Sequence, residues 1–501
     1  MPLLLNLPVE VLRHIIEESM PEGFENLMLS CRAVYECGRF LLESHATRKR
    51  EWRRFSLSRF CIHKSCYRAP VYSISVEPVL ARYMETVLPH PFLWFNYNSI
   101  CGSCRGHTHD PVIEEHIRRS IVESPYLRKA GVDAEKWASE INLMGSNVST
   151  YLWTFYLTLL PNVKVLGLPD YFPHAIQMSQ RLPHGYYGRH RGYWTQTWPV
   201  IKEIGRRIQE NPEDASLGKL TTLRIVGIYS PFGNYKFPIA ILSPLLVLPN
   251  LTELYARNVV ATSYVPHFGS SCWYYRNINS NLRTIELNNS CMDVESISEL
   301  LAHTPYLVSF KFHYNFFPPS RWLAGPFVAA IGKHVGQHLE ELAITMNVRT
   351  TSTVTKAVTS MKEFTKLKRL EIDPQVFYSD HMPAEFEGSR PSYRREMIKS
   401  IPPFTQILPY CLEELKIYFQ SRVESDLISI LGRLFRHFTA NQPKFPPNMK
   451  IYLLYDSRGP PAREVRQYLE TKGVICSDYI PTWLSHYSRQ ELEFANLAGH
   501  F

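Results

Sequence analysis

The chain has few cysteines, ten in 501 residues, and most of them stand alone within apolar stretches. A fold held together by disulfides needs a far higher density, so we expect a reducing compartment and a cytoplasmic or nuclear protein, or both. The sequence also lacks an uninterrupted apolar run of about 18 residues, which a membrane-spanning helix needs. The apolar run at Leu3–Leu5 is too short for a signal peptide, and Pro8 and Glu10 follow it closely.

The chain also lacks a large excess of charge of either sign. Lys and Arg number 55 against 46 Asp and Glu, and a net charge of +9 over this length does not by itself indicate nucleic acid. Basic residues do cluster at Arg48–Arg54, which is typical of a solvated helix end, with a nuclear-import or phosphate-binding role as the alternative. A hydrophobic content of 45% is ordinary for a folded protein, and the length predicts two or more units or a repeat array.

The common catalytic motifs are not present either. The sequence has no GxxxxGK phosphate loop, no GxSxG elbow and no HExxH helix, and its 19 histidines stand in no fixed relation to a nucleophile or a carboxylate pair. We therefore expect a non-catalytic chain without a cofactor.

One group of cysteines has partial metal-ligand spacing. A CxxC pair followed by two histidines is typical of half a zinc site, but the other pair is separated by a wide gap of four residues. The alternative is a set of unpaired cysteines near a surface loop, and we do not expect a resident metal. The candidate zinc ligands are Cys61, Cys66, Cys101 and Cys104.

Residues 5–37 predict three short helices that carry more apolar side chains than they can cover for one another. Pro8 suits the first turn of a helix, and the apolar residues after it, up to Ile16, recur at helical spacing. Pro21 breaks the chain before a second helix, and a third begins near Cys31. A unit of about 40 residues rarely holds together without a metal, a disulfide or a partner. The simplest alternative is a cap that packs its apolar faces on the rest of the chain.

The order of residue types in this unit resembles the F-box motif, without a gap from Leu7 to about Phe40. The match consists of Leu-Pro-Val-Glu-Val-Leu at 7–12, Ile-Ile at 15–16, Pro-Glu at 21–22 and Leu-Ser-Cys-Arg at 29–32. Gly23 and Tyr35 depart from the family's usual acidic residue and Trp. The resemblance implies that the three helices interlock with the Skp adaptor protein, which links them to a cullin and a ubiquitin ligase. The implied adaptor contacts are Leu7, Pro8, Val11, Leu12, Ile15, Ile16, Leu29, Cys31, Arg32 and Tyr35.

Beyond residue 150 a pattern of the form L-x-x-L-x-L recurs, and six consecutive copies begin 25 to 32 residues apart. Amphipathic stretches that predict helices lie between the copies. One strand and one helix per unit is typical of leucine-rich repeats, whose units stack into a curved parallel sheet, and an ordinary α/β fold is the alternative. The copies are 163–168, 220–225, 251–256, 282–287, 307–312, 339–344, 367–372 and 412–417, with a degenerate one at 449–454. The predicted helices are 293–303, 326–338, 352–364 and 424–438.

Two long spacings between copies contain insertions. Residues 181–199 combine aromatic side chains, arginines and glycines, which are typical either of a recognition surface or of a loop folded onto its own repeats. The possible target-binding residues in this loop are Tyr186, Tyr187, Arg189, Arg191, Tyr193 and Trp194. The second insertion, 373–397, is polar and predicts an exposed loop.

These observations predict an α/β fold, in which a small three-helix F-box precedes an irregular leucine-rich-repeat solenoid. The predicted divisions are an F-box-like unit at 1–46, a mixed linker and first repeats at 47–150, the solenoid at 151–480 and a tail or cap at 481–501. Within the second division, 53–60 and 71–76 alternate like short strands.

The combination resembles the divergent F-box proteins of filamentous fungi. It implies the substrate-recognition subunit of an SCF-type ubiquitin ligase, whose partners are the Skp adaptor, through it a cullin, and a target protein of unknown identity. The alternative is a non-ligase repeat protein that acts in transcription or chromatin. A zinc-dependent nucleic-acid binder is a third possibility, but we expect neither nucleic acid nor membrane as a partner.

Overall fold

The computed structural model of the chain describes most of its length, and the account below is confined to that part. The described residues are 4–56, 64–88, 111–142, 148–169, 176–177, 186–226, 235–261, 279–315, 321–346, 353–378, 398–419, 424–436, 449–455, 467, 470–471 and 474–478.

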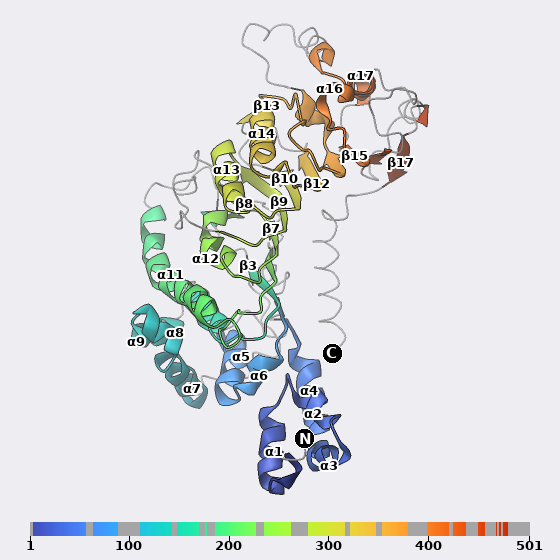
Figure 1. The fold of residues 1–501 in the computed structure, drawn as a ribbon. Coiled ribbons are helices and arrows are strands. Elements are labelled where there is room, and N and C mark those ends of the chain that lie inside the picture. The colour runs from blue at the N-terminus through green and yellow to red at the C-terminus, as the bar shows by residue number, and fades with distance from the viewer. Residues whose placement is uncertain are drawn as a thin grey trace.

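A parallel sheet of 12 strands forms the spine of the molecule, and each strand pairs with the strand before it and the strand after it along this series (Figure 1). The chain therefore has an α/β fold. The strands, in order across the sheet, are β1 (Arg54–Ser56), β2 (Thr86–Leu88), β3 (Val165–Pro169), β5 (Thr222–Val226), β7 (Glu253–Arg257), β9 (Thr284–Met292), β10 (Ser309–Tyr314), β12 (Glu341–Met346), β14 (Arg369–Ile372), β15 (Glu414–Phe419), β16 (Lys450–Tyr455) and β17 (Ile475–Asp478).

All nine predicted repeat copies form strands of this sheet, and each strand begins one or two residues after its copy starts. The apolar positions of the pattern are in register from strand to strand, so that Leu223 pairs with Leu254 and Leu254 with Ile285. These side chains are fully buried. Burial alternates along a strand such as β7, because successive side chains point to opposite faces. The repeat pattern thus sets both the register and the buried face.

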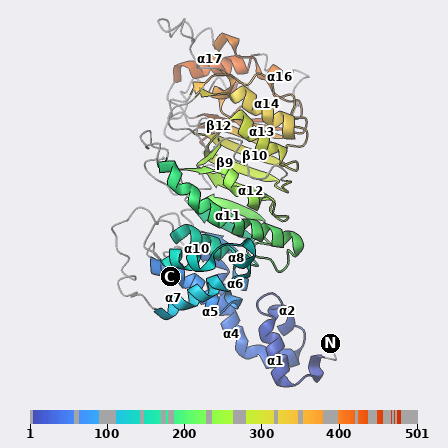
Figure 2. The same ribbon diagram turned by 90° about the vertical axis from the view of Figure 1, so that its left-hand side faces the viewer.

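Helices α11 to α14 lie along the buried face of the sheet in both views (Figures 1 and 2). Phe312 of β10 packs on Phe327 of α14 with 4.7 Å between ring centroids, which is typical of the contact between the two layers. The helices beyond the N-terminal ones are α5 (Lys64–Val76), α6 (Val79–Tyr83), α7 (Pro111–Val122), α8 (Pro125–Ala130), α9 (Ala134–Asn142), α10 (Val148–Leu157), α11 (Tyr186–Glu210), α12 (Ser243–Leu246), α13 (Val294–Ala302), α14 (Ala324–Val335), α16 (Phe404–Ile407) and α17 (Glu424–Leu434).

Local sequence explains where several of these helices begin and end. The Asp293 side chain accepts a hydrogen bond of 2.8 Å from the Ser296 N–H and so caps α13. Gly131 ends α8 at φ 69°, in the left-handed region where a glycine is favoured. Short strands and 3₁₀ turns complete the fold: β4 (Ile176–Gln177), β6 (Tyr235–Pro238), β8 (Val259–Ala261), β11 (Arg321–Trp322), β13 (Thr353–Val354), η1 (Leu4–Asn6), η2 (Arg39–Leu41), η5 (Ile239–Leu242) and η7 (Pro374–Phe377).

Asparagines in successive repeats bond to one another next to the strands. Asn258 and Asn289 both adopt the left-handed backbone conformation that asparagine tolerates better than most residues. The Asn289 side-chain amide donates to the Asn258 oxygen, and the Asn315 amide donates to the Asn289 oxygen. The 31-residue and 26-residue sequence separations of these pairs are those of neighbouring repeats. This ladder supplies hydrogen bonds between repeats: Asn258 and Asn315 directly follow β7 and β10, and Asn289 lies within β9.

The N-terminal unit, residues 4–52, stands at one end of the molecule, below the first strands in Figure 1. It contains α1 (Val9–Glu18), α2 (Phe24–Met28), α3 (Arg32–Gly38) and α4 (Leu42–Trp52), so the three short helices that the sequence predicts are present and a fourth follows. Its separate core includes Tyr83 of α6, which comes from outside the unit. Trp52 packs against both this core and the core of the sheet. The unit is therefore closed on one side by the rest of the chain.

Several predictions about elements are wrong. The segment 71–76 lies in helix α5 and not in a strand, and 352–364 contains the two-residue strand β13 followed by turns in place of a helix. The predicted loop at 181–199 becomes helix α11 from residue 186 on, because the aromatic and charged residues there sit at spacings that a helix also accommodates. The start of the predicted exposed loop 373–397 is the buried turn η7. The short strand expected within 53–60 is present as β1, and with β2 it extends the sheet into the division predicted as a mixed linker and first repeats.

Candidate functional site

The N-terminal unit exposes a group of large apolar side chains that its own core does not cover. Six of the eleven exposed large hydrophobic residues in the described part of the chain lie between residues 7 and 40. We call this group the apolar patch: Leu7 (37% exposed), Val9 (47%), Val11 (44%), Leu29 (83%), Tyr35 (44%) and Phe40 (56%). Exposed apolar side chains gathered on one small unit are typical of a surface that binds another protein.

The helical periodicity of α1 determines which of its apolar side chains are buried and which are exposed. Leu12 and Ile16 are one helical turn apart and lie in the core, while Val11 on the next face is exposed. The Arg13 guanidinium lies 5.6 Å from the centroid of the Phe40 ring, which brings η2 beside α1. One face of α1 thus packs into the unit's core, and Val9 and Val11 on its other sides are exposed.

The ten predicted adaptor contacts differ in exposure and fall into three groups. Leu7, Pro8, Val11, Leu29, Arg32 and Tyr35 are exposed, and Ile15 and Cys31 are half-buried. Leu12 and Ile16 are 4% and 0% exposed and lie in the unit's own core, so in this structure they pack its helices together and offer no surface. Val9 and Phe40 belong to the patch but were not predicted as contacts, although their apolar side chains are the signal that could have found them.

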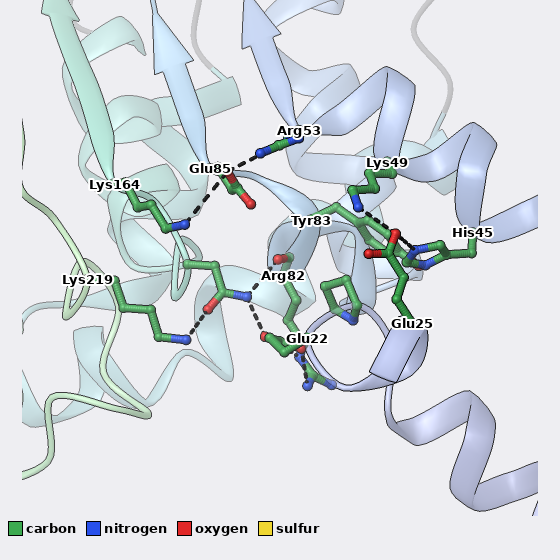
Figure 3. A pocket seen from close by; sticks show the side chains of 12 residues that line it. Glu22, Glu25, His45, Lys49, Arg53, Arg82, Tyr83, Glu85, Lys164 and Lys219 are labelled. Carbon is green, nitrogen blue, oxygen red and sulfur yellow. Dashed lines mark hydrogen bonds and ion pairs between the residues drawn. The ribbon is translucent and has the colours of Figure 1, made fainter. Parts of the chain in front are cut away.

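Where the N-terminal unit meets the first strands, polar side chains line a cavity of about 240 Å³, which we call the joint pocket (Figure 3). Helices α2 and α4 form one side of it, and the turns that precede β2, β3 and β5 form the other. Its lining residues are Pro21, Glu22, Glu25, His45, Lys49, Arg53, Arg82, Tyr83, Glu85, Asn162, Lys164 and Lys219.

Asn162 connects four segments across this joint. Its side-chain N–H groups donate to the Glu22 carboxylate and to the Arg82 carbonyl oxygen, the latter at 2.6 Å. Its Oδ1 accepts from Lys219 Nζ at 2.7 Å, and Arg82 Nη2 pairs with Glu22 Oε2 at 2.6 Å. Burial alone would raise the pKa of Glu22, but the hydrogen bonds from Asn162 and Arg82 outweigh it and hold that pKa below its ordinary value. Glu22 is therefore a carboxylate at neutral pH.

A second set of contacts joins α2, α4 and α6. Lys49 Nζ donates to Glu25 Oε1 at 2.5 Å, and this bond, with a further one from His45, lowers the pKa of Glu25. His45 is buried, and burial lowers its pKa, so the ring is neutral at pH 7. Because a carboxylate only accepts, the ring N–H is on Nε2, 3.4 Å from Glu25, and Nδ1 accepts from the Tyr83 hydroxyl at 2.8 Å. These contacts fix α4 to α6.

Much of the basic run Arg48–Arg54 is ion-paired within this region. Arg48 pairs with Glu77, Lys49 with Glu25, and Arg53 Nε with Glu85 Oε2 at 3.1 Å. The run therefore attaches α4 to its neighbours, and its pattern does not favour a nucleic-acid surface. Sequence reasoning missed Arg82, Asn162 and Lys219 as members of this joint, because each stands alone in a turn or short helix far from the others along the chain.

The face of the sheet opposite the helices carries alternating acidic and basic side chains, and we call it the open face. Lys311 of β10 lies between two carboxylates, with its Nζ 3.1 Å from Glu286 Oε1 and 3.3 Å from Glu341 Oε1. Arg369 of β14 approaches Glu341 at 3.7 Å. Burial would lower the pKa of Lys311, but the two carboxylates outweigh it and raise that pKa. The charges on this part of the open face are therefore paired with one another.

The remaining predicted site residues are not tested. Tyr186, Tyr187, Arg189, Arg191, Tyr193 and Trp194 lie in helix α11 by their backbone, and their side chains lie outside the described residues. The same holds for Cys66 in α5, while Cys61, Cys101 and Cys104 lie outside the described residues altogether. Within the described part, no three His, Cys, Asp or Glu side chains are grouped to hold a metal ion, and none of the helices there could cross a membrane.

No family model matches this chain, and no curated protein sequence matches it.

Proposed function

We propose that this protein is the substrate-recognition subunit of an SCF-type ubiquitin ligase. In this proposal the N-terminal unit is an F-box that binds the Skp adaptor, and the sheet with its helices is a leucine-rich-repeat solenoid that holds the target protein. The observation that carries it is the apolar patch, since it lies on the one unit whose residue order resembles the F-box. The chain itself contributes affinity and orientation, and other subunits carry out the covalent chemistry.

The repeats support the second half of the proposal. Nine copies of one sequence pattern form parallel strands in register, and an asparagine ladder links neighbouring turns. Repeated units of this kind create a long surface whose contacts can be varied one repeat at a time. The balanced charges of the open face favour a folded target protein of mixed charge.

The joint gives the proposal a mechanical basis. An ion pair with Arg82 and a hydrogen bond from Asn162 attach Glu22 of the N-terminal unit to α6 and to the turn before β3, and Lys219 links Asn162 in turn to the segment before β5. A receptor that presents a target to a conjugating enzyme benefits from a fixed distance between its two binding surfaces, because a flexible link lowers the effective concentration of the target.

Binding of purified Skp adaptor to the full chain tests the proposal. Val11→Asp with Leu29→Asp places two charges in the patch, and each lost apolar contact is worth about 1.5 kcal/mol or more, so we expect affinity to fall by about a hundred-fold. Both residues are exposed, so the thermal midpoint should not change. Val112→Asp is the matched control, because Val112 is 59% exposed on α7, outside the N-terminal unit.

Calorimetric titration of the wild-type chain and these variants gives the answer. Wild-type and control proteins that bind the adaptor equally, with a double variant that does not, support the proposal. An adaptor that binds all three proteins alike, or none of them, contradicts it.

A further inference from the structure

The charges that line the joint pocket are not balanced. Among the described residues that line it, five side chains are basic, namely Lys49, Arg53, Arg82, Lys164 and Lys219, and three are carboxylates, namely Glu22, Glu25 and Glu85. His45 adds no charge, because burial lowers its pKa. The lining therefore carries two more positive charges than negative ones.

The excess of basic side chains is found around Glu85 and not around Glu22 or Glu25. Glu22 is held by Arg82 and Asn162, and Glu25 is held by Lys49 and His45. This leaves Glu85 as the single carboxylate for three cations, Arg53, Lys164 and Lys219. Figure 3 shows Lys164 and Lys219 reaching into the pocket from the turns before β3 and β5, with Arg53 entering from the end of α4.

These three cations use little of their hydrogen-bonding capacity within the described residues. Lys164 Nζ is 3.8 Å from Glu85 Oε2, which is an ion pair but lies beyond hydrogen-bond distance. Lys219 donates to the neutral Asn162 oxygen, and Arg53 donates to Glu85 through Nε, so no bond to another described residue engages its two terminal nitrogens. Guanidinium and ammonium groups of this kind bind tetrahedral oxyanions through several short hydrogen bonds at once.

We propose that the joint pocket binds a phosphate dianion through Arg53, Lys164 and Lys219, either as free phosphate or as a small phosphate monoester. Its two negative charges equal the excess of the lining, and the cavity of about 240 Å³ is large enough for several solvent-sized groups. The ligand would bridge α4 of the N-terminal unit and the turns before β3 and β5, and so add a contact across the joint. The proposal does not depend on adaptor binding.

Calorimetric titration of the full chain with inorganic phosphate, and separately with glycerol phosphate, tests this site at constant ionic strength set with sodium chloride. We expect saturable binding to the wild-type chain. In Lys164→Ser with Lys219→Ser, affinity should fall by about ten-fold for each lysine removed, because each contributes a charge-assisted hydrogen bond. Lys129→Ser with Lys136→Ser is the matched control, because both lysines are exposed and lie outside the pocket.

A further variant, Glu85→Gln, changes affinity in the opposite direction. It removes the carboxylate that competes for Arg53 and Lys164, so phosphate should bind more tightly than to the wild-type chain. Tighter binding of glycerol phosphate than of phosphate identifies a monoester as the source of the group, and the reverse order identifies the free ion. No binding to the wild-type chain, equal binding to the pocket-lysine variant, or unchanged binding to Glu85→Gln overturns the proposal.

Discussion

Replacing Asp373 by asparagine should remove a defined part of the protein's pH dependence. The Asp373 side chain lies directly after β14, is 1% exposed and accepts a hydrogen bond of 2.9 Å from the Gln375 N–H through Oδ1. Among the residues that the structure describes, its Oδ2 meets no hydrogen-bond partner. Burial raises the pKa of Asp373 from 3.8 to about 7, and backbone hydrogen bonds only partly oppose this. Ionisation of Asp373 above pH 7 therefore destabilises the folded state.

Proton linkage gives the direction and the size of the change in stability with pH that Asp373 causes. Because the folded pKa is raised, the folded state holds more protons than the unfolded state between pH 3.8 and about 7. Stability is thus highest below this window, falls as the pH rises through it and levels off above about pH 7. Between pH 5 and pH 8 the wild-type chain should lose about 2 to 3 kcal/mol that Asp373→Asn does not lose.

Urea unfolding of both proteins at pH 5, 6, 7 and 8 measures this difference. Asp214→Asn is the control, because it makes the same substitution at an exposed position. A difference between Asp373→Asn and wild type that stays constant from pH 5 to pH 8 would refute the assignment of Asp373 as a desolvated carboxyl group.

Three further predictions concern the joint, the open face and a close backbone contact. Asn162→Asp places a second carboxylate beside Glu22 and removes the two N–H donors of the side chain, so the free energy of unfolding should fall by about 2 kcal/mol. A thermal midpoint equal to that of wild type would contradict the hydrogen bonds described for the joint. Lys311→Met leaves Glu286 and Glu341 without their shared cation, so it should destabilise the chain by about 1 to 3 kcal/mol at pH 7 and less at pH 4, as urea unfolding at both pH values would show. Gly325→Ala brings a Cβ within 2.2 Å of the Ala357 carbonyl oxygen and should cost about 1 to 3 kcal/mol in thermal unfolding. Gly205→Ala, whose Cβ would meet its nearest atom at 3.6 Å within α11, should instead be neutral or stabilising, and equal effects of the two changes would refute this reading.

The sequence predicts the sheet well, because the repeat pattern is local and each copy carries the same information. Leu220 and Leu251 begin neighbouring copies, and the alternation after each of them determines which face is buried and which register joins the strands. Helices are less predictable. Residues 186–199 read as an aromatic insertion and form a helix, and residues 352–364 have helical periodicity and form a short strand with turns. In 352–364, burial of Val354, Val358 and Met361 in the core overrides a weak helical preference.

The candidate site is predictable only in part. Exposed and buried positions of α1 share one apolar pattern, so the sequence did not separate Val11, which is exposed, from Leu12, which is in the core. The joint could not be predicted at all, because Glu22, Asn162 and Lys219 come together only when the N-terminal unit docks on the first strands. Long-range polar contacts of this kind leave no periodic signal in the sequence.

Co-purification of the tagged full chain with both the Skp adaptor and a cullin tests the central claim most directly. The account predicts that the wild-type chain and Val112→Asp retain both partners, and that Val11→Asp with Leu29→Asp retains neither. Recovery of the adaptor without cullin would contradict the ligase assignment, and the absence of both partners from the wild-type chain would contradict the F-box assignment itself.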